Sequence, residues 1–204
     1  MVSARLIGIR RHRLQTDGDG VTTLVAFNGC PLRCRFCLNK ACWEPDQGNE
    51  YTPETLFEEV KIDQLYFLAT HGGITFGGGE PLLQKDFIKE FRALCGPQWQ
   101  IVVETSLHVP FETVQEMDAV LDGYIVDVKD MNPEIYKAYS GISNEHVIDN
   151  LRWIASEHPE LLSTITLRLP HIPNYNTDDD RNKSQAFLET LGYTNFDRFE
   201  YRIR

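Results

Sequence analysis

The stretch VTTLVAFNGCPLRCRFCLNK (residues 21–40) joins a strand pattern directly to a loop that contains three cysteines. Residues 21–27 are apolar and rich in β-branched side chains, which predicts a buried strand. Cys30, Cys34 and Cys37 then follow within eight residues. A structural zinc site uses four ligands, a disulfide two and a catalytic cysteine one, so three clustered thiols match none of these directly. The stretch therefore predicts a metal or cluster site at the end of a strand.

The rest of the chain alternates strand and helix patterns. Further strand patterns cover residues 73–76, 100–104, 123–129, 163–169 and 195–203. Helical patterns cover residues 53–68, 84–94, 111–121, 133–139, 145–157 and 181–192. This alternation predicts an α/β fold with a parallel sheet and helical crossovers. Six strands, where a closed barrel has eight, favour an open, partial (β/α)6 TIM-like barrel. A flat, doubly wound sheet is the alternative.

Composition limits the classes of partner and compartment. The formal net charge is −10, which argues against nucleic acid as a partner because nucleic-acid binders usually carry a basic patch. No apolar run approaches the ~20 residues of a membrane span, and the start of the chain has no apolar signal segment. Five cysteines, with three clustered, do not indicate a disulfide framework. We therefore expect no membrane partner and a reducing, cytoplasmic location.

Polar and glycine-rich features follow the predicted strands at their carboxyl ends. GGGEP (77–81) comes directly after one strand, and the other strand-end residues are Glu104, Thr105, Ser106, Asp127, Lys129 and Arg168. The carboxyl ends of parallel strands meet at one edge of the sheet, which is where such folds build their sites. We therefore expect these side chains to share one site with the cysteines.

The three thiols suit an iron–sulfur cluster that is incompletely coordinated by protein. A [4Fe–4S] cluster has four irons, so three cysteines leave one iron free for another ligand. Two alternatives remain open from the spacing. In one, Cys42 supplies a fourth thiolate and closes the site; in the other, His71 or Cys42 completes a zinc knuckle.

The GGGEP segment suits a ligand that carries both a carboxylate and an ammonium group. Successive backbone N–H groups of glycines can bind a carboxylate, and the Glu80 carboxylate can accept from an ammonium. An amino acid carries both groups. The alternative is a tight turn from strand to helix, with Pro81 opening the helix.

These residues resemble a known family. CPLRCRFC (30–37) is similar to the C-x3-C-x-aromatic-C signature of radical S-adenosylmethionine (SAM) enzymes, and residues 78–80 resemble their GGE motif. The likeness extends from about residue 7 to residue 201 for one group, the glycyl-radical-enzyme activases of the pyruvate formate-lyase activating enzyme type. Its further segments are DGDGVTTLVAFNGC (17–30), CLNKACW (37–43), DVKDMNPEIYKAYSGISNEHVIDNL (127–151) and RLPHIPNYN (168–176).

The resemblance implies a cluster and a SAM site. Cys30, Cys34 and Cys37 would hold the [4Fe–4S] cluster, and SAM would chelate the fourth iron. The residues implied around the adenine are Phe36 and Asn39, and those around the methionyl amino group are Gly78, Gly79 and Glu80. Those implied around the ribose, the methionyl end and the carboxylate are Glu104, Ser106, Asp127, Lys129 and Arg168, with room for a monovalent cation beside SAM.

The resemblance also implies an activity. An electron from a flavodoxin or ferredoxin-type donor would reduce the cluster, SAM would be cleaved, and the deoxyadenosyl radical would take a hydrogen atom. The expected target is a glycine of a partner glycyl radical enzyme. The alternatives are a radical SAM enzyme acting on a small molecule, similar to 7-carboxy-7-deazaguanine synthase, and a non-catalytic iron–sulfur or zinc module.

The chain departs from the family pattern in several places. Asn174 stands where a glycine is frequent, and Glu104 where a shorter Asp is also used. Only Cys42 and Cys95 remain outside the cluster motif, so we expect a single radical SAM domain over residues 1–204 without the eight-cysteine ferredoxin-like insert. The sequence ends at Arg204, within or just after the last predicted strand. We therefore expect the partner to complete the lower rim of the site.

Overall fold

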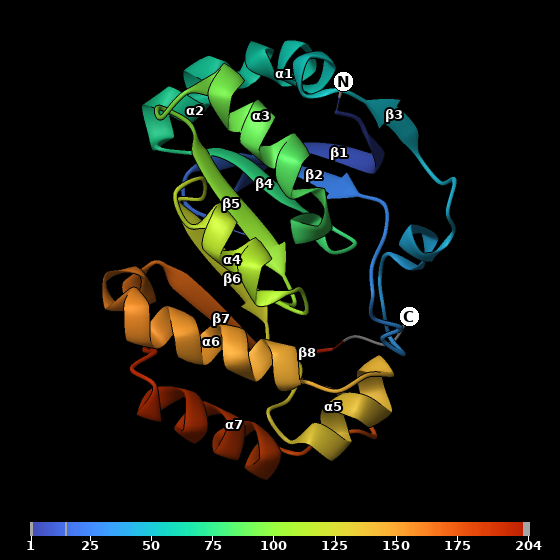
Figure 1. Cartoon of the computed structure of the whole chain (residues 1–204), viewed down its shortest axis with the longest axis vertical. Coiled ribbons are helices and arrows are strands. Elements are labelled where there is room, and N and C mark those ends of the chain that lie inside the picture. Colours follow the sequence, from blue (N-terminus) through green and yellow to red (C-terminus); the bar gives the residue numbers. More distant parts are fainter. Residues whose placement is uncertain (1, 15, 202–204) are drawn as a thin grey trace.

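The computed structural model describes residues 2–14 and 16–201 and shows one mixed sheet with helices along it (Figure 1). The strand order is β3-β1-β2-β4-β5-β6-β7-β8. The strands are β1 (Ala4–Leu14), β2 (Val21–Phe27), β3 (Asn49–Tyr51), β4 (Gly73–Gly78), β5 (Gln100–Thr105), β6 (Gly123–Asp127), β7 (Ile165–His171) and β8 (Phe196–Glu200).

The six predicted parallel strands are confirmed. From β2 to β8, leaving out β3, each strand pairs in parallel with the next one along the chain. This consecutive order is that of a barrel, whereas a doubly wound sheet reverses its order at a switch point. Strands β3 and β8 are the two edges and do not pair with each other, so the barrel is open as predicted. The predicted last strand extended to residue 203, and residues 202–204 lie outside the described part.

Two further strands, β1 and β3, extend the sheet at one end and were not predicted. Strand β1 pairs antiparallel with both β2 and β3. Its exposed, arginine-rich second half lacks an apolar alternation, and its register shifts between Arg10 and Arg13. His12 lies within that shift and has a φ of 56°. An irregular strand of this kind gives little period-two signal.

Seven α-helices and four short 3-10 helices connect the strands of the described chain. The α-helices are α1 (Pro53–Val60), α2 (Gln64–Thr70), α3 (Lys85–Cys95), α4 (Phe111–Met117), α5 (Pro133–Ser140), α6 (Glu145–Glu157) and α7 (Asp178–Thr190). The 3-10 helices are η1 (Lys40–Trp43), η2 (Lys61–Asp63), η3 (Pro81–Gln84) and η4 (Pro159–Ser163). In the described residues no helix is both long enough and apolar enough to cross a bilayer.

The predicted helix over 53–68 is broken at η2, where the buried side chain of Asp63 turns toward β1. Its carboxylate accepts a hydrogen bond from Arg11 Nε at 2.6 Å and lies 2.9 Å from His12 Nε2. Burial of a charge requires such partners. This attachment to β1, which the helical period does not encode, coincides with the break between α1 and α2.

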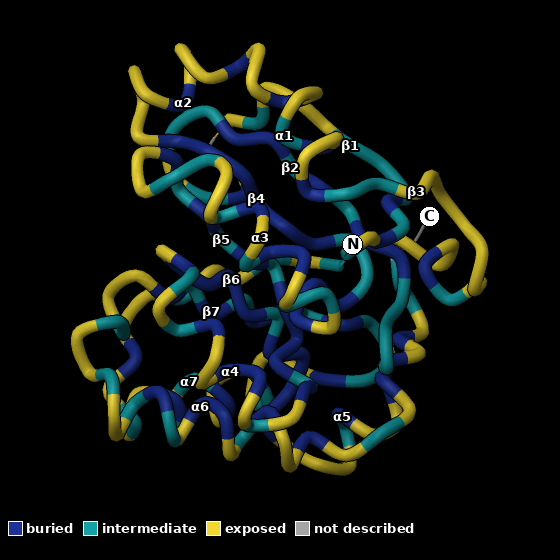
Figure 2. Tube along the Cα trace, turned by 45° about the horizontal axis from the view of Figure 1, so that its top comes forward, coloured by how far each residue is buried: buried dark blue, intermediate teal, exposed yellow. Residues whose placement is uncertain are grey.

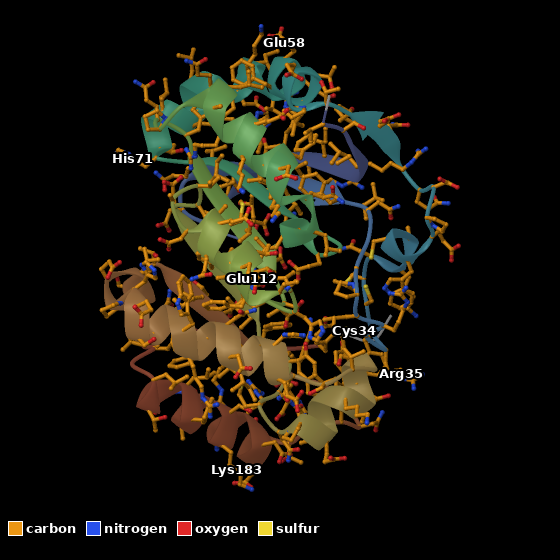
Figure 3. The ribbon with its side chains drawn as sticks, viewed as in Figure 1. Cys34, Arg35, Glu58, His71, Glu112 and Lys183 are labelled. Atoms are coloured by element: carbon orange, nitrogen blue, oxygen red, sulfur yellow. The ribbon has the colours of Figure 1, made fainter. Side chains whose placement is uncertain are left out.

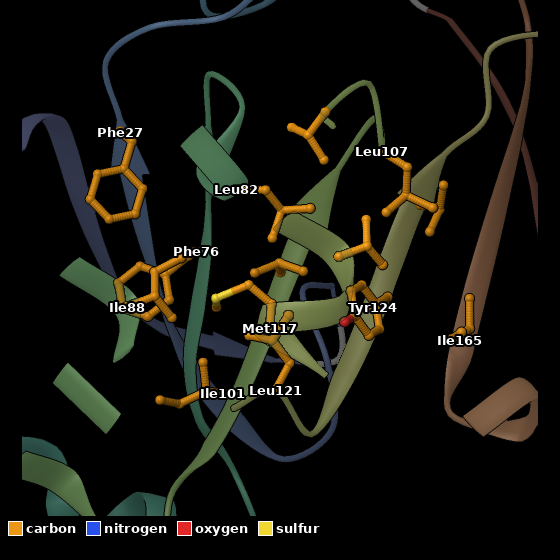
Figure 4. Packing of buried hydrophobic residues seen from close by; sticks show 14 of the residues in the cluster. Phe27, Phe76, Leu82, Ile88, Ile101, Leu107, Met117, Leu121, Tyr124 and Ile165 are labelled. Atoms are coloured by element: carbon orange, nitrogen blue, oxygen red, sulfur yellow. The ribbon is translucent and has the colours of Figure 1, made fainter. Parts of the chain in front are cut away.

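Aromatic packing between the sheet and its helices forms much of the core. The Phe76 ring centroid lies 5.3 Å from that of Phe27 and 5.5 Å from that of Phe91, which belongs to α3. Leu82, Ile101 and other apolar side chains continue this core beneath α3 and α4 (Figure 4). Buried residues follow the strands and the inner helix faces, while the outer helix faces are exposed (Figure 2). The strand ends that carry the candidate site are therefore held on a rigid scaffold.

Asn150 of α6 fastens the loop that follows β5. Its Nδ2 donates to the carbonyl oxygens of Leu107 at 2.9 Å and Val109 at 3.0 Å, and the side chain is buried. Asn150→Ala leaves both carbonyls without this donor, so we expect a loss of about 1–3 kcal/mol in the free energy of unfolding. Urea unfolding of the cofactor-free protein measures it.

Ser156→Ala, at an exposed position of the same helix, is the matched control and should change the free energy of unfolding by less than about 0.5 kcal/mol. Equal stabilities of the Asn150 variant and this control would contradict the role assigned to Asn150.

Candidate active site

The cysteine loop leaves β2 and is tied down on two sides. On the β1 side, the Asn28 backbone N–H donates to the Arg5 carbonyl at 2.8 Å. On the other side, the backbone N–H groups of Arg33 and Arg35 donate to the carbonyls of Ser140 and Tyr139 at 2.8 and 3.1 Å. Both acceptors lie at the C-terminal end of α5. The loop is therefore held between the first strands and the helix after β6.

The three predicted cluster cysteines lie on this loop as free thiols. Cys34, which is labelled in Figure 3, is buried, and Cys30 and Cys37 are half-buried. Burial raises the pKa of Cys30 to about 12 and that of Cys34 to about 11. Because iron binds thiolates, ligation by these groups releases protons.

The glycine segment is joined to the cysteine loop by backbone hydrogen bonds. The Gly79 N–H donates to the Phe27 carbonyl at 2.9 Å, and the Glu80 N–H donates to the Gly29 carbonyl at 2.8 Å. A Cβ added at Gly79 would lie 2.0 Å from the Gly29 carbonyl oxygen. Gly78 has a φ of 91°, and a Cβ there would lie 2.7 Å from Ala26. Only residues without a side chain permit this approach.

Glu80 is almost fully buried, and its carboxylate accepts four hydrogen bonds from the chain. The donors are Thr105 Oγ1 at 2.5 Å, Ser106 N–H at 2.9 Å, Ser106 Oγ at 2.7 Å and Leu82 N–H at 3.2 Å. Burial raises the pKa of Glu80, and these hydrogen bonds oppose that shift. Glu80 thus links the end of β4 to the end of β5. Its predicted contact with an ammonium group stays a prediction, and the part played by Thr105 was not foreseen.

Asp127 and Lys129 form an ion pair beside Cys34, in which Lys129 is buried and Asp127 is half-buried. Lys129 Nζ pairs with Asp127 Oδ2, and Lys129 has a left-handed φ of 63°. Burial lowers the pKa of Lys129, but the Asp127 carboxylate and the neighbouring acidic groups together outweigh that effect, so the pKa lies well above its ordinary value. The second oxygen, Asp127 Oδ1, is buried and has no hydrogen-bond partner in the described chain. An unpaired buried acceptor of this kind suits a ligand hydroxyl or a cation.

Arg168 and Glu104 are brought together across the sheet. Arg168 Nη1 pairs with Glu104 Oε1, Nη2 donates to the Thr16 carbonyl at 2.7 Å, and Nε lies 3.4 Å from Asp197. Burial raises the pKa of Glu104, and the charge of Arg168 opposes this shift. The guanidinium is thus engaged by the chain on three sides. Its predicted contact with a ligand carboxylate stays a prediction.

Phe36 and Asn39 lie next to the two loops. The Phe36 ring is surrounded by Tyr139, Tyr175 and Tyr201, with centroid distances of 6.1, 5.9 and 6.4 Å. These tyrosines were not predicted, because they come from three distant segments and no spacing links them. Asn39 Nδ2 donates to the Gly78 carbonyl at 3.0 Å, so this side chain also joins the cysteine loop to the glycine segment.

The zinc alternative through His71 is not supported by the geometry. His71 follows α2 and precedes the start of β4, whereas the cysteine loop leaves the opposite end of the parallel strand β2. Within residues 2–14 and 16–201, no three His, Cys, Asp or Glu side chains are placed to bind a single metal ion. A [4Fe–4S] cluster spreads its cysteines over several irons, so it needs a wider arrangement. The three-cysteine loop beside a glycine cradle fits such a cluster.

Cys42 is buried in η1 close to the cluster motif. The pKa of Cys42 is raised to about 11 by its burial, which has the larger effect, and by the nearby Cys37. The Cys42 carbonyl accepts from the Gly29 N–H at 2.9 Å. The alternative in which Cys42 supplies a fourth thiolate therefore remains open on geometry.

Comparisons with known proteins agree on one family. Residues 24–183 match the model of the radical SAM superfamily. The chain is 35% identical over 251 residues to the (2S)-3-sulfopropanediol dehydratase activating enzyme of Klebsiella oxytoca, covering 92% of this chain and 78% of that enzyme. It is 28% identical over 174 residues to the pyruvate formate-lyase 1-activating enzyme of Escherichia coli K12, covering 80% of this chain and 66% of that enzyme.

Solved structures show the same fold at low sequence identity. Streptococcus suis SuiB bound to S-adenosylmethionine matches with a TM-score of 0.66 at 12% identity, covering 88% of this chain and 42% of that one. The protein anSMEcpe with bound AdoMet matches with a TM-score of 0.59 at 15% identity, covering 85% of this chain and 48% of that one.

The close approach at Gly79 generates a prediction. Gly79→Ala places a Cβ against the Gly29 carbonyl, so the glycine segment and the cysteine loop must separate. We expect iron retained after anaerobic reconstitution to fall to less than about half of the parent value, because rigid interiors do not absorb such an overlap. Iron content and far-UV circular dichroism are measured together. Gly8→Ala, which meets no atom within 4 Å, is the control and should load normally. A normal iron content in the Gly79 variant would contradict the claim that the glycine segment must lie against the cysteine loop for a cluster to bind.

Proposed function

The chain belongs to the radical SAM superfamily, and from that premise we propose that it activates a glycyl radical enzyme. In this proposal it cleaves SAM reductively at a [4Fe–4S] cluster and removes a hydrogen atom from a glycine of the partner. The main support for the proposal is that backbone hydrogen bonds of Gly79 and Glu80 hold the glycine segment against the cysteine loop at Gly29. Relatives in sequence from Klebsiella oxytoca, Escherichia coli and Listeria monocytogenes are themselves named as activating enzymes.

The chain's own residues have distinct tasks in this mechanism. Cys30, Cys34 and Cys37 would hold the cluster, which when bound supplies the electron that cleaves SAM. Because Gly78 and Gly79 have no side chains, the glycine segment packs against Ala26 and Gly29 and lies next to the cysteine loop, where the methionyl group would bind. Glu80 orients this segment through its four hydrogen bonds to neighbouring donors.

The other strand ends bind and shield the ligand. Asp127 offers a free carboxylate oxygen for a ribose hydroxyl or for a monovalent cation, and Lys129 keeps a positive charge beside it. Phe36 and the surrounding tyrosines form an apolar wall that excludes water from the reacting groups. Arg168 holds Glu104 and, through it, the end of β5. Ser106, which bonds to Glu80, keeps the next strand end in place.

A protein substrate is favoured over a small molecule by the relatives and by the open sheet. The strand ends carry two ion pairs, Asp127 with Lys129 and Arg168 with Glu104. A glycine has no side chain, so an extended segment that contains one is a suitable substrate to approach them. A non-catalytic iron–sulfur module has no need for a cradle that fits an amino acid.

The proposal also includes a cellular compartment and a domain organisation. All five cysteines are free thiols, which supports a reducing compartment such as the cytoplasm. The continuous sheet runs from β1 to β8 through the whole described chain, which supports one radical SAM domain.

The function is tested by following SAM cleavage and radical formation together. Reconstituted protein is reduced without oxygen and mixed with candidate glycyl radical enzymes. We expect slow, uncoupled SAM cleavage by the protein alone, because the partner's loop is absent from the site. With the right partner, SAM cleavage should be coupled to a persistent glycine-centred EPR doublet. The matched control is the same partner with its radical-bearing glycine changed to alanine, which should give no doublet.

Rapid, fully coupled conversion of a small molecule by the isolated protein would contradict this function and favour the alternative. If a fully loaded and reduced protein did not cleave SAM at all, both the proposed activation of a glycyl radical enzyme and the small-molecule alternative would be contradicted.

A further inference from the structure

Helix α5 carries two buried tyrosines whose hydroxyls the proposed mechanism does not use. Tyr136 and Tyr139 are both fully buried. Neither hydroxyl oxygen has a hydrogen-bond partner within residues 2–14 and 16–201. An unpaired buried hydroxyl costs free energy, and native structures keep few of them. The two hydroxyls are therefore candidates for a hydrogen bond that forms only when a cofactor is bound.

The last turn of α5 lies against the cysteine loop on both sides of Cys34. The backbone N–H groups of Arg33 and Arg35 donate to the carbonyls of Ser140 and Tyr139 at 2.8 and 3.1 Å. These two donors flank Cys34 in sequence, so Cys34 lies beside the C-terminal end of α5 (Figure 3). The buried face of α5, which begins one turn earlier, is therefore next to a proposed cluster ligand.

Of the two tyrosines, Tyr139 belongs to the aromatic group around Phe36. Its ring centroid lies 6.1 Å from that of Phe36, 5.3 Å from that of Tyr175 and 6.1 Å from that of Tyr201. Tyr136 makes no ring contact with another aromatic side chain in the part of the chain that the structure describes. The Tyr139 ring is thus part of the apolar wall, whereas Tyr136 is free for a polar role.

The Tyr136 hydroxyl lies among the charged groups of the candidate site. Burial raises its pKa well above the ordinary value, and the charge of Lys129 opposes this shift. Cys34 raises the pKa further and acts more strongly than Asp127 or Glu80. The hydroxyl therefore keeps its proton, which leaves it able to donate a hydrogen bond.

The chain offers the Tyr136 hydroxyl no acceptor before a cofactor binds. Asp127 Oδ1 is also buried and without a partner among the described residues, so the two do not bond to each other. The Glu80 carboxylate already accepts four hydrogen bonds, and a charged Lys129 can only donate. The Cys34 sulfur remains. It becomes a stronger acceptor as an iron-bound thiolate, because hydrogen bonds to charged groups are the stronger ones.

We propose that the Tyr136 hydroxyl donates a hydrogen bond to the Cys34 sulfur when the cluster is bound, and that this bond raises the reduction potential of the cluster. The proposal rests on the proposed function, because it presumes a cluster held by Cys34. Hydrogen bonds to the sulfurs are among the factors that set the potential of an iron–sulfur cluster. Reduction adds negative charge, so a donor stabilises the reduced form more than the oxidised form. Tyr136 acts through Cys34 and is a positioning residue.

The test removes one hydroxyl at a time from the reconstituted full chain. Tyr136→Phe keeps the ring and deletes the unpaired hydroxyl. The matched control is Tyr193→Phe, because Tyr193 is equally buried and its hydroxyl donates to the Leu151 carbonyl at 3.0 Å. The cluster is titrated anaerobically without SAM and followed by EPR, and exchangeable protons near the reduced cluster are detected by ENDOR after transfer to D2O. Urea unfolding of the cofactor-free variants is measured alongside.

We expect the equilibrium constant for cluster reduction in Tyr136→Phe to fall at least about fivefold, which is about 40 mV at 59 mV per tenfold change for a one-electron couple. One exchangeable-proton signal should be lost with it. Iron content and unfolding should match the parent's, because this hydroxyl has no partner in the described chain. Tyr193→Phe should show the converse, with an unfolding equilibrium constant raised about fivefold and an unchanged potential.

Four outcomes overturn the proposal. The first is an unchanged potential in Tyr136→Phe, and the second is an equal fall in Tyr193→Phe. The third is a loss of iron or of stability in Tyr136→Phe, which would make this hydroxyl structural. The fourth is a fall in potential in Tyr139→Phe alone, which would assign the donor to Tyr139. A parent protein that holds a reducible cluster but cleaves no SAM would contradict the proposed function instead, whatever the potential of Tyr136→Phe, so the two failures are distinguished.

Discussion

Two backbone hydrogen bonds hold the candidate site together, and they require that no side chain stand between the strands. They run from the N–H groups of Gly79 and Glu80 to the carbonyls of Phe27 and Gly29. A Cβ at Gly79 would meet the Gly29 carbonyl at 2.0 Å, so glycine there is a steric necessity. Through this join the cysteine loop after β2 and the glycine segment after β4 form one surface. The later strand ends are added to it by side chains, beginning with the bonds of Thr105 and Ser106 to Glu80.

The charged pairs at this edge are wholly or partly removed from water, which costs free energy and suggests a role other than stability. Isolated buried ions are strongly unfavourable, and even paired ones seldom stabilise more than apolar residues of similar volume. Yet Asp127 and Lys129 are paired beside Cys34, and Arg168 and Glu104 are paired across the sheet. Asp127 retains an unpaired oxygen, which a self-sufficient ion pair would not leave. Such an arrangement is typical of a binding site whose last partner is a ligand.

The part of this architecture that follows local patterns could be predicted from sequence. The strands predicted at 21–27, 73–76 and 123–129 are mainly apolar and end in, or are followed by, polar or glycine residues, so the parallel sheet and the edge that carries the candidate site could both be predicted. Strand β1 was missed because its arginines break the apolar alternation, and the break at Asp63 was missed because it depends on a contact with β1. The tyrosines around Phe36, and the engagement of Arg168 by Thr16, are tertiary contacts between distant segments that no local period encodes.

We propose that Cys30, Cys34 and Cys37 hold a cluster whose fourth iron is left to SAM. EPR spectra of the anaerobically reconstituted and reduced protein, with and without SAM, test it in the parent and in the Cys34→Ala and Cys42→Ala variants. With Cys30, Cys34 and Cys37 as the only protein ligands, we expect about four irons per chain and a signal that SAM changes, both in the parent and in Cys42→Ala. Cys34→Ala should lose both. Loss of the cluster in Cys42→Ala to the same extent as in Cys34→Ala would contradict the account and establish a closed, four-cysteine site.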